Sequence, residues 1–346
     1  MKNYNKLYDI DVLRSFGIIL VVFFHAYLMM YANHFPNLKS TYKSLYGLWG
    51  ILPWFHMPLF IFMAGYLYAH QMNKNDNCVS FLIFKGGYII KKIKRLIIPY
   101  FIFSSIYLFI FVRMTNFSSI FGGGVNHLWF IAMLFWCFML IRLLNNRNIP
   151  ESKLRLLIIL LVSFCFMIFP NYLPRCMGIQ YITKWFFWFY LGYSIYIHSD
   201  VCKKLICRYN LAWVLPVVYG ICMYTQIRLY GYDYESKTIY TEIGFLSAVI
   251  WLWYAVNWLI GKFGTGWATS RFILEVSACS FGIYIFHCFV QPLLISRTAQ
   301  KCLPLAQWAT DHVVLFPLFF SLLSLLISYV ITRFFLMTRI GKFLIG

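Results

Sequence analysis

The stretch Asp9–Met30, which reads DIDVLRSFGIILVVFFHAYLMM, decides the fold. It is long enough to cross a bilayer as a helix. It also carries two polar side chains, Arg14 near its start and His25 deep inside it. Their spacing amounts to three helical turns plus about 20°, so both lie on nearly one face, about 16 Å apart along the axis. An ionisable group at membrane depth is costly, which makes this stripe a candidate functional site.

Each of these residues also has a purely structural interpretation. Arg14 can be an anchor whose side chain extends to the lipid headgroups at the cytoplasmic face. His25 can be a neutral histidine that forms a hydrogen bond across a helix interface. Asp11 lies three residues before Arg14, on the same face of the helix, and is predicted to orient the guanidinium of Arg14.

The composition predicts an all-α, polytopic bundle of transmembrane helices. Of the 346 residues, 62% are hydrophobic and only 12% are charged, whereas soluble domains carry about 25% charged residues. Apolar runs of membrane-spanning length recur to the end of the chain, so a single membrane domain over residues 1–346 is expected. About ten spans are predicted, over residues 11–31, 48–69, 94–113, 127–144, 155–170, 181–198, 211–228, 241–260, 274–295 and 313–335.

The charge pattern predicts the orientation of these spans. The formal net charge is +20, but the basic residues lie in short loops between spans, which argues against nucleic-acid binding and favours contact with membrane lipid. About two thirds of the 30 lysines and arginines fall on one side if the N-terminus is cytoplasmic. Both termini are therefore predicted to be cytoplasmic, in a plasma or inner membrane. The ten cysteines contain no CxxC pair, so neither a disulfide framework nor a metal site is predicted.

Further polar residues recur at or near predicted spans, and each has two interpretations. His56 precedes Pro58, which is expected to kink its helix, so His56 either packs between helices or lines a cavity. His287 ends the run SFGIYIFH and has the same two interpretations. His127 and Trp129 follow three glycines, and Trp129 can be an interface anchor or a platform for a sugar ring. Lys94 and Arg95 can set topology or bind the phosphate groups of a ligand.

Five motifs, in order along the chain, carry a resemblance to a known family. They are DVLR at Asp11–Arg14 with His25 following eleven residues after Arg14, FHMPLFIFMAGYLY at Phe55–Tyr68, KRLIIPY at Lys94–Tyr100, HLWFIAMLF at His127–Phe135 and SFGIYIFH at Ser280–His287. As a set they resemble the acyltransferase-3 family of integral membrane acyltransferases. The form FHMPLF is most similar to the branch that O-acetylates sugars and exopolysaccharides.

The resemblance implies an O-acyltransferase that transfers an acetyl group from cytosolic acetyl-CoA to a hydroxyl of a cell-surface or lipid-linked carbohydrate of the cell envelope. A positioned imidazole is a suitable general base at neutral pH, which makes His25 the candidate base. Arg14, oriented by Asp11, is the candidate partner of the donor's phosphate or carbonyl oxygen, together with Lys94 and Arg95. The candidate acceptor contacts are His56, His127, Trp129 and His287.

Two other functions also suit such a sequence. A secondary transporter of a small solute would explain ten or so spans, a histidine at mid-membrane and a helix broken at proline, although no pair of broken helices in two repeated halves is found. A membrane subunit without catalytic activity, such as a flippase or an assembly partner, is the third possibility.

Overall fold

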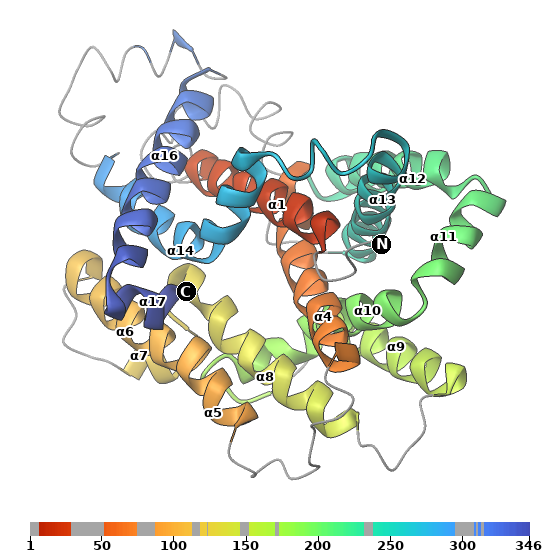
Figure 1. Cartoon of the computed structure of the whole chain (residues 1–346), viewed down its shortest axis with the longest axis horizontal. Helices are drawn as coiled ribbons and strands as arrows, with labels where there is room; N and C mark the ends of the chain where they lie inside the picture. Colours follow the sequence, from red (N-terminus) through yellow and green to blue (C-terminus); the bar gives the residue numbers. More distant parts are fainter. Residues whose placement is uncertain are drawn as a thin grey trace. The chain divides into compact units, whose positions relative to one another are not determined.

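The structure is a computed structural model in which all regular secondary structure of the described residues is helical (Figure 1). It describes residues 7–28, 52–74, 87–112, 118–122, 124–145, 152–169, 173–231, 238–294, 308, 311–312 and 315–346. No strand occurs within these ranges. The predicted all-α fold class is therefore confirmed.

The chain divides into two compact units, which are described separately. The first unit comprises Met1–Phe60 and Asp200–Phe334, and the second comprises Ile61–Ser199 and Phe335–Gly346. The main helices of the first unit are α1 (Tyr8–Leu28), α11 (Ser199–Arg208), α12 (Leu211–Tyr230), α13 (Ile239–Phe263), α14 (Arg271–Leu294) and α16 (Leu315–Met337). The short 3₁₀ helix η2 (Leu52–Phe55) and the first turn of α4 (His56–Lys74) also belong to it.

The second unit holds the rest of α4 and the middle of the chain. Its longer helices are α6 (Ile98–Tyr107), α8 (Trp129–Leu144), α9 (Lys153–Ile168) and α10 (Ile182–Ile197). Its shorter elements are α5 (Tyr88–Lys92), η3 (Ile93–Ile97), η4 (Leu108–Val112), α7 (Ser118–Phe121), η5 (Asn126–Leu128), η6 (Ile179–Tyr181) and α17 (Arg339–Ile345).

Every predicted membrane span overlaps one of these helices, but not all of the helices are long enough to cross a bilayer. Among the described residues, six helical segments have the length and hydropathy of a span. A seventh is added if α11 and α12, which meet at an angle of 83°, are counted together as one span. Helices α9 and α10 have only 16 residues each. The count of about ten spans therefore remains a prediction.

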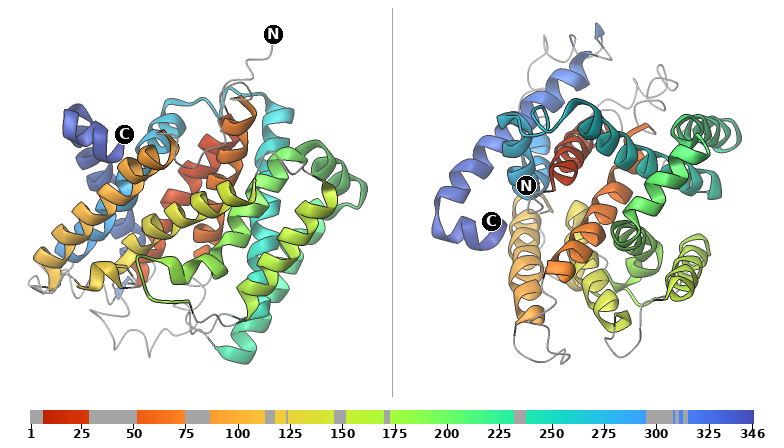
Figure 2. Two further views of the ribbon diagram at one scale, coloured as in Figure 1. Left: turned by 90° about the horizontal axis from the view of Figure 1, so that it is seen from below. Right: turned by 45° about the vertical axis from the view of Figure 1, so that its right-hand side comes forward.

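Helix α1 lies in the middle of the first unit. It packs against α14 and α13 and against η2 (Figures 1 and 2). Leu13, Ile18 and Val21 of α1 are fully buried. Since lipid is as apolar as these side chains, their burial reflects close helix packing and not the hydrophobic effect alone.

The break expected at Pro58 takes the form of a change in helix type. The chain turns as 3₁₀ helix η2 up to Phe55, and the α-helix begins at His56. Pro58 is the third residue of α4, where a missing backbone N–H costs no intrahelical hydrogen bond. Pro58 therefore lies in the first turn of α4, and this arrangement places His56 at the N-terminus of α4.

Two glycines permit a close crossing of α4 and α10 in the second unit. A Cβ atom added at Gly65 would overlap the carbonyl oxygen of Phe189, and one added at Gly192 would overlap the carbonyl oxygen of Phe62. Each helix thus contributes a glycine to the contact, as in membrane helix pairs that meet through small residues.

We predict that Gly192→Ala lowers the stability of the protein, because the added methyl group must push the backbone of α4 away at a cost of about 1–3 kcal/mol. The measurement is the midpoint of thermal unfolding of the purified protein in detergent. Gly220→Ala on α12 is the matched control, because a Cβ atom there meets nothing within 4 Å. Equal midpoints for the two variants would contradict the close crossing.

Candidate active site

Three histidines from three helices meet in the first unit. The ring centroid of His25 on α1 lies 5.0 Å from that of His287 on α14 and 6.2 Å from that of His56 on α4. His56 and His287 are buried, with exposed fractions of 2% and 0%, and His25 is half-buried. Phe24 packs against both His25 and His56. The structure thus brings together three of the residues that the sequence predicts for the site.

The hydrogen bonds around His25 and His287 determine where the ring protons lie. Nδ1 of His25 is 3.0 Å from the carbonyl oxygen of Val21, and Nδ1 of His287 is 3.1 Å from that of Ile283. A carbonyl oxygen can only accept, so each Nδ1 must carry a proton. In the neutral form of both rings, Nε2 is then an unprotonated acceptor.

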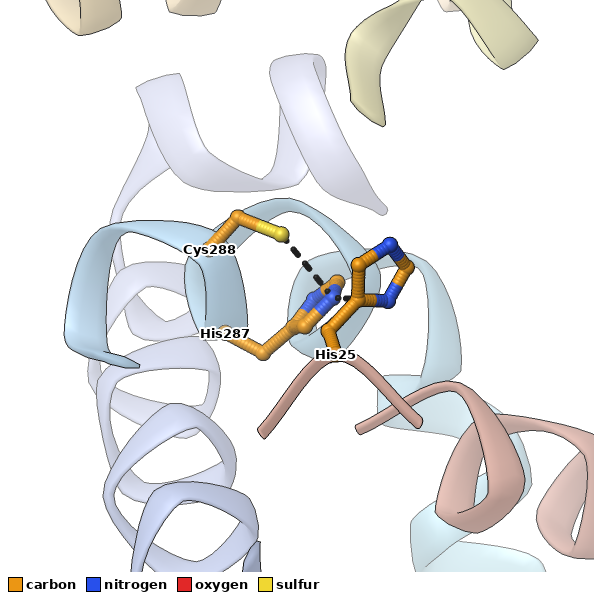
Figure 3. A group of neighbouring side chains, drawn as sticks. All are labelled: His25, His287 and Cys288. Atoms are coloured by element: carbon orange, nitrogen blue, oxygen red, sulfur yellow. Dashed lines mark hydrogen bonds between the residues drawn. The ribbon is translucent and has the colours of Figure 1, made fainter. Parts of the chain in front are cut away.

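Nε2 of His287 receives two further contacts, as Figure 3 shows. Nδ1 of His25 is 3.3 Å away and Sγ of Cys288 is 3.1 Å away. The proton on Nδ1 of His25 is therefore shared between Val21 and His287, and the thiol of Cys288 donates to the same nitrogen of His287. Both hydrogen bonds of His25 use Nδ1, which leaves its Nε2 as the basic nitrogen.

Further polar contacts join α1 to α14 along their length. Nε2 of Gln291 donates to the carbonyl oxygen of Val22 at 2.9 Å, one turn beyond His287. Oγ of Ser15 donates to the carbonyl oxygen of Ile273 at 2.7 Å, and Oγ of Ser277 donates to Asp11 Oδ1 at 2.7 Å. These hydrogen bonds fix the register of the two helices and so the approach of His25 to His287.

Asp11 and Arg14 lie near the start of α1, and both are half-buried. The carboxylate of Asp11 accepts the hydrogen bond from Ser277, so this residue links α1 to α14. The neighbouring carboxylate, Asp9, is buried and accepts from Nδ2 of Asn257 on α13 at 3.3 Å. The orientation of Arg14 by Asp11 remains a prediction.

The remaining predicted site residues belong to the second unit. Lys94 and Arg95 lie on η3, and both are exposed. His127 on η5 is buried, and the half-buried ring of Trp129 lies 4.8 Å from Tyr181 and 5.5 Å from Trp185. Trp129 thus belongs to a cluster of three aromatic rings.

The glycines before Trp129 have a structural role. Gly124 adopts a φ of +100°, which side chains rarely allow, and a Cβ atom there would collide with Trp129. At least one of the three glycines is therefore required by the tight turn that positions this ring.

The donor atoms of His25, His287 and Cys288 lie within 4.8 Å of one another, close enough to hold one metal ion. The hydrogen bonds argue against that use. A metal ion bound to Nδ1 of His25 would displace the proton that this nitrogen donates to Val21. Nε2 of His287, in contrast, carries no proton that a metal ion would have to displace, because the ring proton of His287 is on Nδ1. The absence of a metal site therefore remains a prediction.

Sequence reasoning did not identify two members of this cluster. The cysteines predicted neither a disulfide framework nor a metal site, and no role was predicted for Cys288, yet its thiol contacts His287. Gln291 is a polar residue one helical turn after His287, and this spacing in an apolar helix could have revealed it.

Comparison with known proteins places the chain in a family. The model of the acyltransferase domain of the acyltransferase-3 family matches residues 7–333, which include every motif quoted above. Searches of curated proteins and of solved structures found no significant match. Because the matched region covers nearly the whole chain and contains the histidine cluster, the protein belongs to the acyltransferase-3 family and is a membrane acyltransferase.

Proposed function

We propose that the protein is an O-acyltransferase that transfers an acetyl group from acetyl-CoA to a hydroxyl of a cell-surface or lipid-linked carbohydrate, with His25 as the general base. The observation that supports this most directly is the hydrogen bonding of the two ring nitrogens of His25. Its Nδ1 is held by Val21 and His287, and its Nε2 is available to accept a proton.

The proposed reaction is a single displacement. Nε2 of His25 accepts the proton of the acceptor hydroxyl while the hydroxyl oxygen attacks the thioester carbonyl carbon. The C–S bond then breaks, and the thiolate of coenzyme A takes up the proton. While His25 is an imidazolium, its Nδ1–H points at the acceptor nitrogen of His287, a charge-assisted hydrogen bond that stabilises the transition state.

Cationic residues are proposed to bind the donor. Arg14 is near the start of α1, which the predicted topology places at the cytoplasmic face. Lys94 and Arg95 are exposed on η3, in a segment that the same topology places inside the cell. Guanidinium and ammonium groups are suited to the phosphates of coenzyme A.

The acceptor is proposed to be a glycan handled by the plasma or inner membrane. The apolar rings of Trp129, Tyr181 and Trp185 resemble a platform for the C–H face of a sugar. His127 lies two residues before Trp129, with its ring 6.2 Å from that of Tyr107. His56 lies beside the base, so it is the proposed contact to the reacting hydroxyl.

The proposal is tested with purified protein in lipid, radiolabelled acetyl-CoA and a crude surface-glycan fraction. Wild type is expected to label the glycan, and His25→Ala is expected to reduce the rate about 10²–10⁴-fold, the usual contribution of a general base. His312→Ala, which removes an exposed histidine, is the control and keeps full activity. Unchanged labelling by His25→Ala would remove His25 from the mechanism, and solute uptake into vesicles without any acyl product would overturn the proposal in favour of a transporter.

We predict that His287→Ala lowers kcat about 10–100-fold with little change in KM, because a hydrogen bond to a charged group contributes about 1.5–3 kcal/mol. Cys288→Ala removes only a weak thiol donor from the same nitrogen and is expected to retain most of the activity. The two variants are compared in steady-state assays, with intact folding checked by thermal unfolding. A larger effect for Cys288→Ala than for His287→Ala would contradict the assigned roles.

Activity is predicted to survive removal of metal ions. Dialysis against a chelator should leave kcat unchanged, because His25 acts as a free base and not as a ligand. Metal analysis of the purified protein provides the parallel measurement. A loss of activity that added zinc restores would show that His25, His287 and Cys288 bind a metal ion.

A further inference from the structure

Two cation–aromatic pairs cross between α5 and α8 in the second unit. Tyr88 and Lys92 are four residues apart on α5, and Phe138 and Arg142 are four residues apart on α8. Nζ of Lys92 lies 3.3 Å from the ring centroid of Phe138, and Cζ of Arg142 lies 5.6 Å from that of Tyr88. Nζ of Lys92 also lies 5.5 Å from the ring centroid of Tyr88, so both cations contact that ring.

The region around Tyr88 contains hydrogen-bond donors but no anion among the described residues. The hydroxyl of Tyr88 is buried and has no hydrogen-bond partner there. The sequence of the second unit contains only two acidic residues, Asp76 and Glu151, and both lie outside the described ranges. The only ion pair within the described ranges joins Arg333 to Glu275 in the first unit.

We infer that Tyr88, Lys92 and Arg142 form a binding site for a phosphate group. The ammonium of Lys92 and the guanidinium of Arg142 have hydrogen-bond donors and no acceptors, and the hydroxyl of Tyr88 has a proton to donate. An acceptor-rich anion satisfies all three groups together, and phosphate matches the planar fork of arginine. The flanking rings of Tyr88 and Phe138 partly exclude water, which strengthens such contacts.

Cation–aromatic contacts alone do not account for the arrangement. Such pairs stabilise helix packing, and they would hold α5 against α8 without any ligand. They make no use of the Tyr88 hydroxyl, which a phenylalanine would replace at no loss of packing. Its buried, unpaired position carries a desolvation cost that a bound anion would offset.

The location of the site suggests the source of the phosphate. Tyr88 and Lys92 lie near the beginning of one apolar segment, Tyr88–Val112, and Arg142 lies near the end of the next, Ser118–Leu144. The predicted topology places both of these ends in the cytoplasm. Two ligands could present a phosphate group at that face, namely a soluble nucleotide donor and the headgroup of an anionic phospholipid.

The assignment to the donor rests on the proposed function, whereas the anion site itself does not. If coenzyme A is the donor, Lys92 and Arg142 add a half-buried subsite to the exposed cations Lys94 and Arg95. The site is therefore best tested by direct binding, which requires no turnover and remains informative if the acyl-transfer proposal fails.

The experiment measures binding of coenzyme A and of inorganic pyrophosphate to the full chain in nanodiscs of zwitterionic lipid. The variants are Tyr88→Phe, which retains the ring, and Arg142→Gln, with Lys153→Gln on α9 as a control because Lys153 is exposed and outside the cluster. Arg142→Gln is expected to raise Kd about tenfold or more and Tyr88→Phe several-fold, because each variant removes hydrogen bonds to a charged group. The control Lys153→Gln is expected to change Kd less than twofold. Thermal unfolding confirms that the variants remain folded.

A second arm uses nanodiscs that contain phosphatidylglycerol, with retained lipid counted after purification. Loss of retained lipid in Tyr88→Phe and Arg142→Gln, with unchanged binding of coenzyme A, would support the phosphate site and assign it to lipid. Weaker binding of coenzyme A with unchanged lipid assigns it to the donor. If neither variant alters binding of either ligand relative to Lys153→Gln, the inference is overturned.

Discussion

The first unit depends on the pairing of polar groups between α1 and α14. Lipid hydrocarbon offers no hydrogen bonds, so a polar side chain on a membrane helix must find a partner on a neighbouring helix. Asp11, Ser15 and His25 of α1 all do so, with partners on α14. Leu13, Ile18 and Val21, which lie between them on α1, are fully buried. This single interface therefore both holds the unit together and arranges the candidate base.

The same requirement explains how a histidine can be poised for catalysis in an apolar setting. If the Nδ1 of His25 were unpaired, the ring could rotate or exchange its tautomer. The carbonyl of Val21 and the Nε2 of His287 share that proton, and the proton of His287 is in turn held by Ile283. The chain of hydrogen bonds ends at backbone carbonyls, which cannot change their protonation state. It therefore leaves one basic nitrogen, on His25, where a proton can be accepted.

The two units differ in how they treat charge. In the first unit, acidic groups have partners: Asp9 contacts Asn257, and Glu275 contacts Arg333 and Tyr329. In the second unit, half of the chain's 30 lysines and arginines are accompanied by only two acidic residues. Aromatic rings compensate some of these cations, as for Lys92 and Arg142. An excess of cationic over acidic residues suits anionic ligands, and a unit with paired charges suits an insulated base.

Much of this organisation could be predicted from the sequence. The interval from Arg14 to His25 placed both on one face of a helix, and α1 is continuous over that interval. The motifs identified the family. Helical periodicity sufficed for these predictions because it depends only on neighbouring residues along the chain.

The tertiary structure alone decided which groups meet. His25 and His287 are 262 residues apart, and neither spacing nor hydropathy indicates which helix covers the face of α1 that bears His25. The same limit hid the contact of Cys288 with His287 and the reciprocal contacts of Lys92 and Arg142. Periodicity determines the direction in which a side chain leaves its own helix. The partner it finds depends on the packing of helices against one another, in which apolar surfaces are nearly interchangeable and a few hydrogen bonds and small residues select the arrangement.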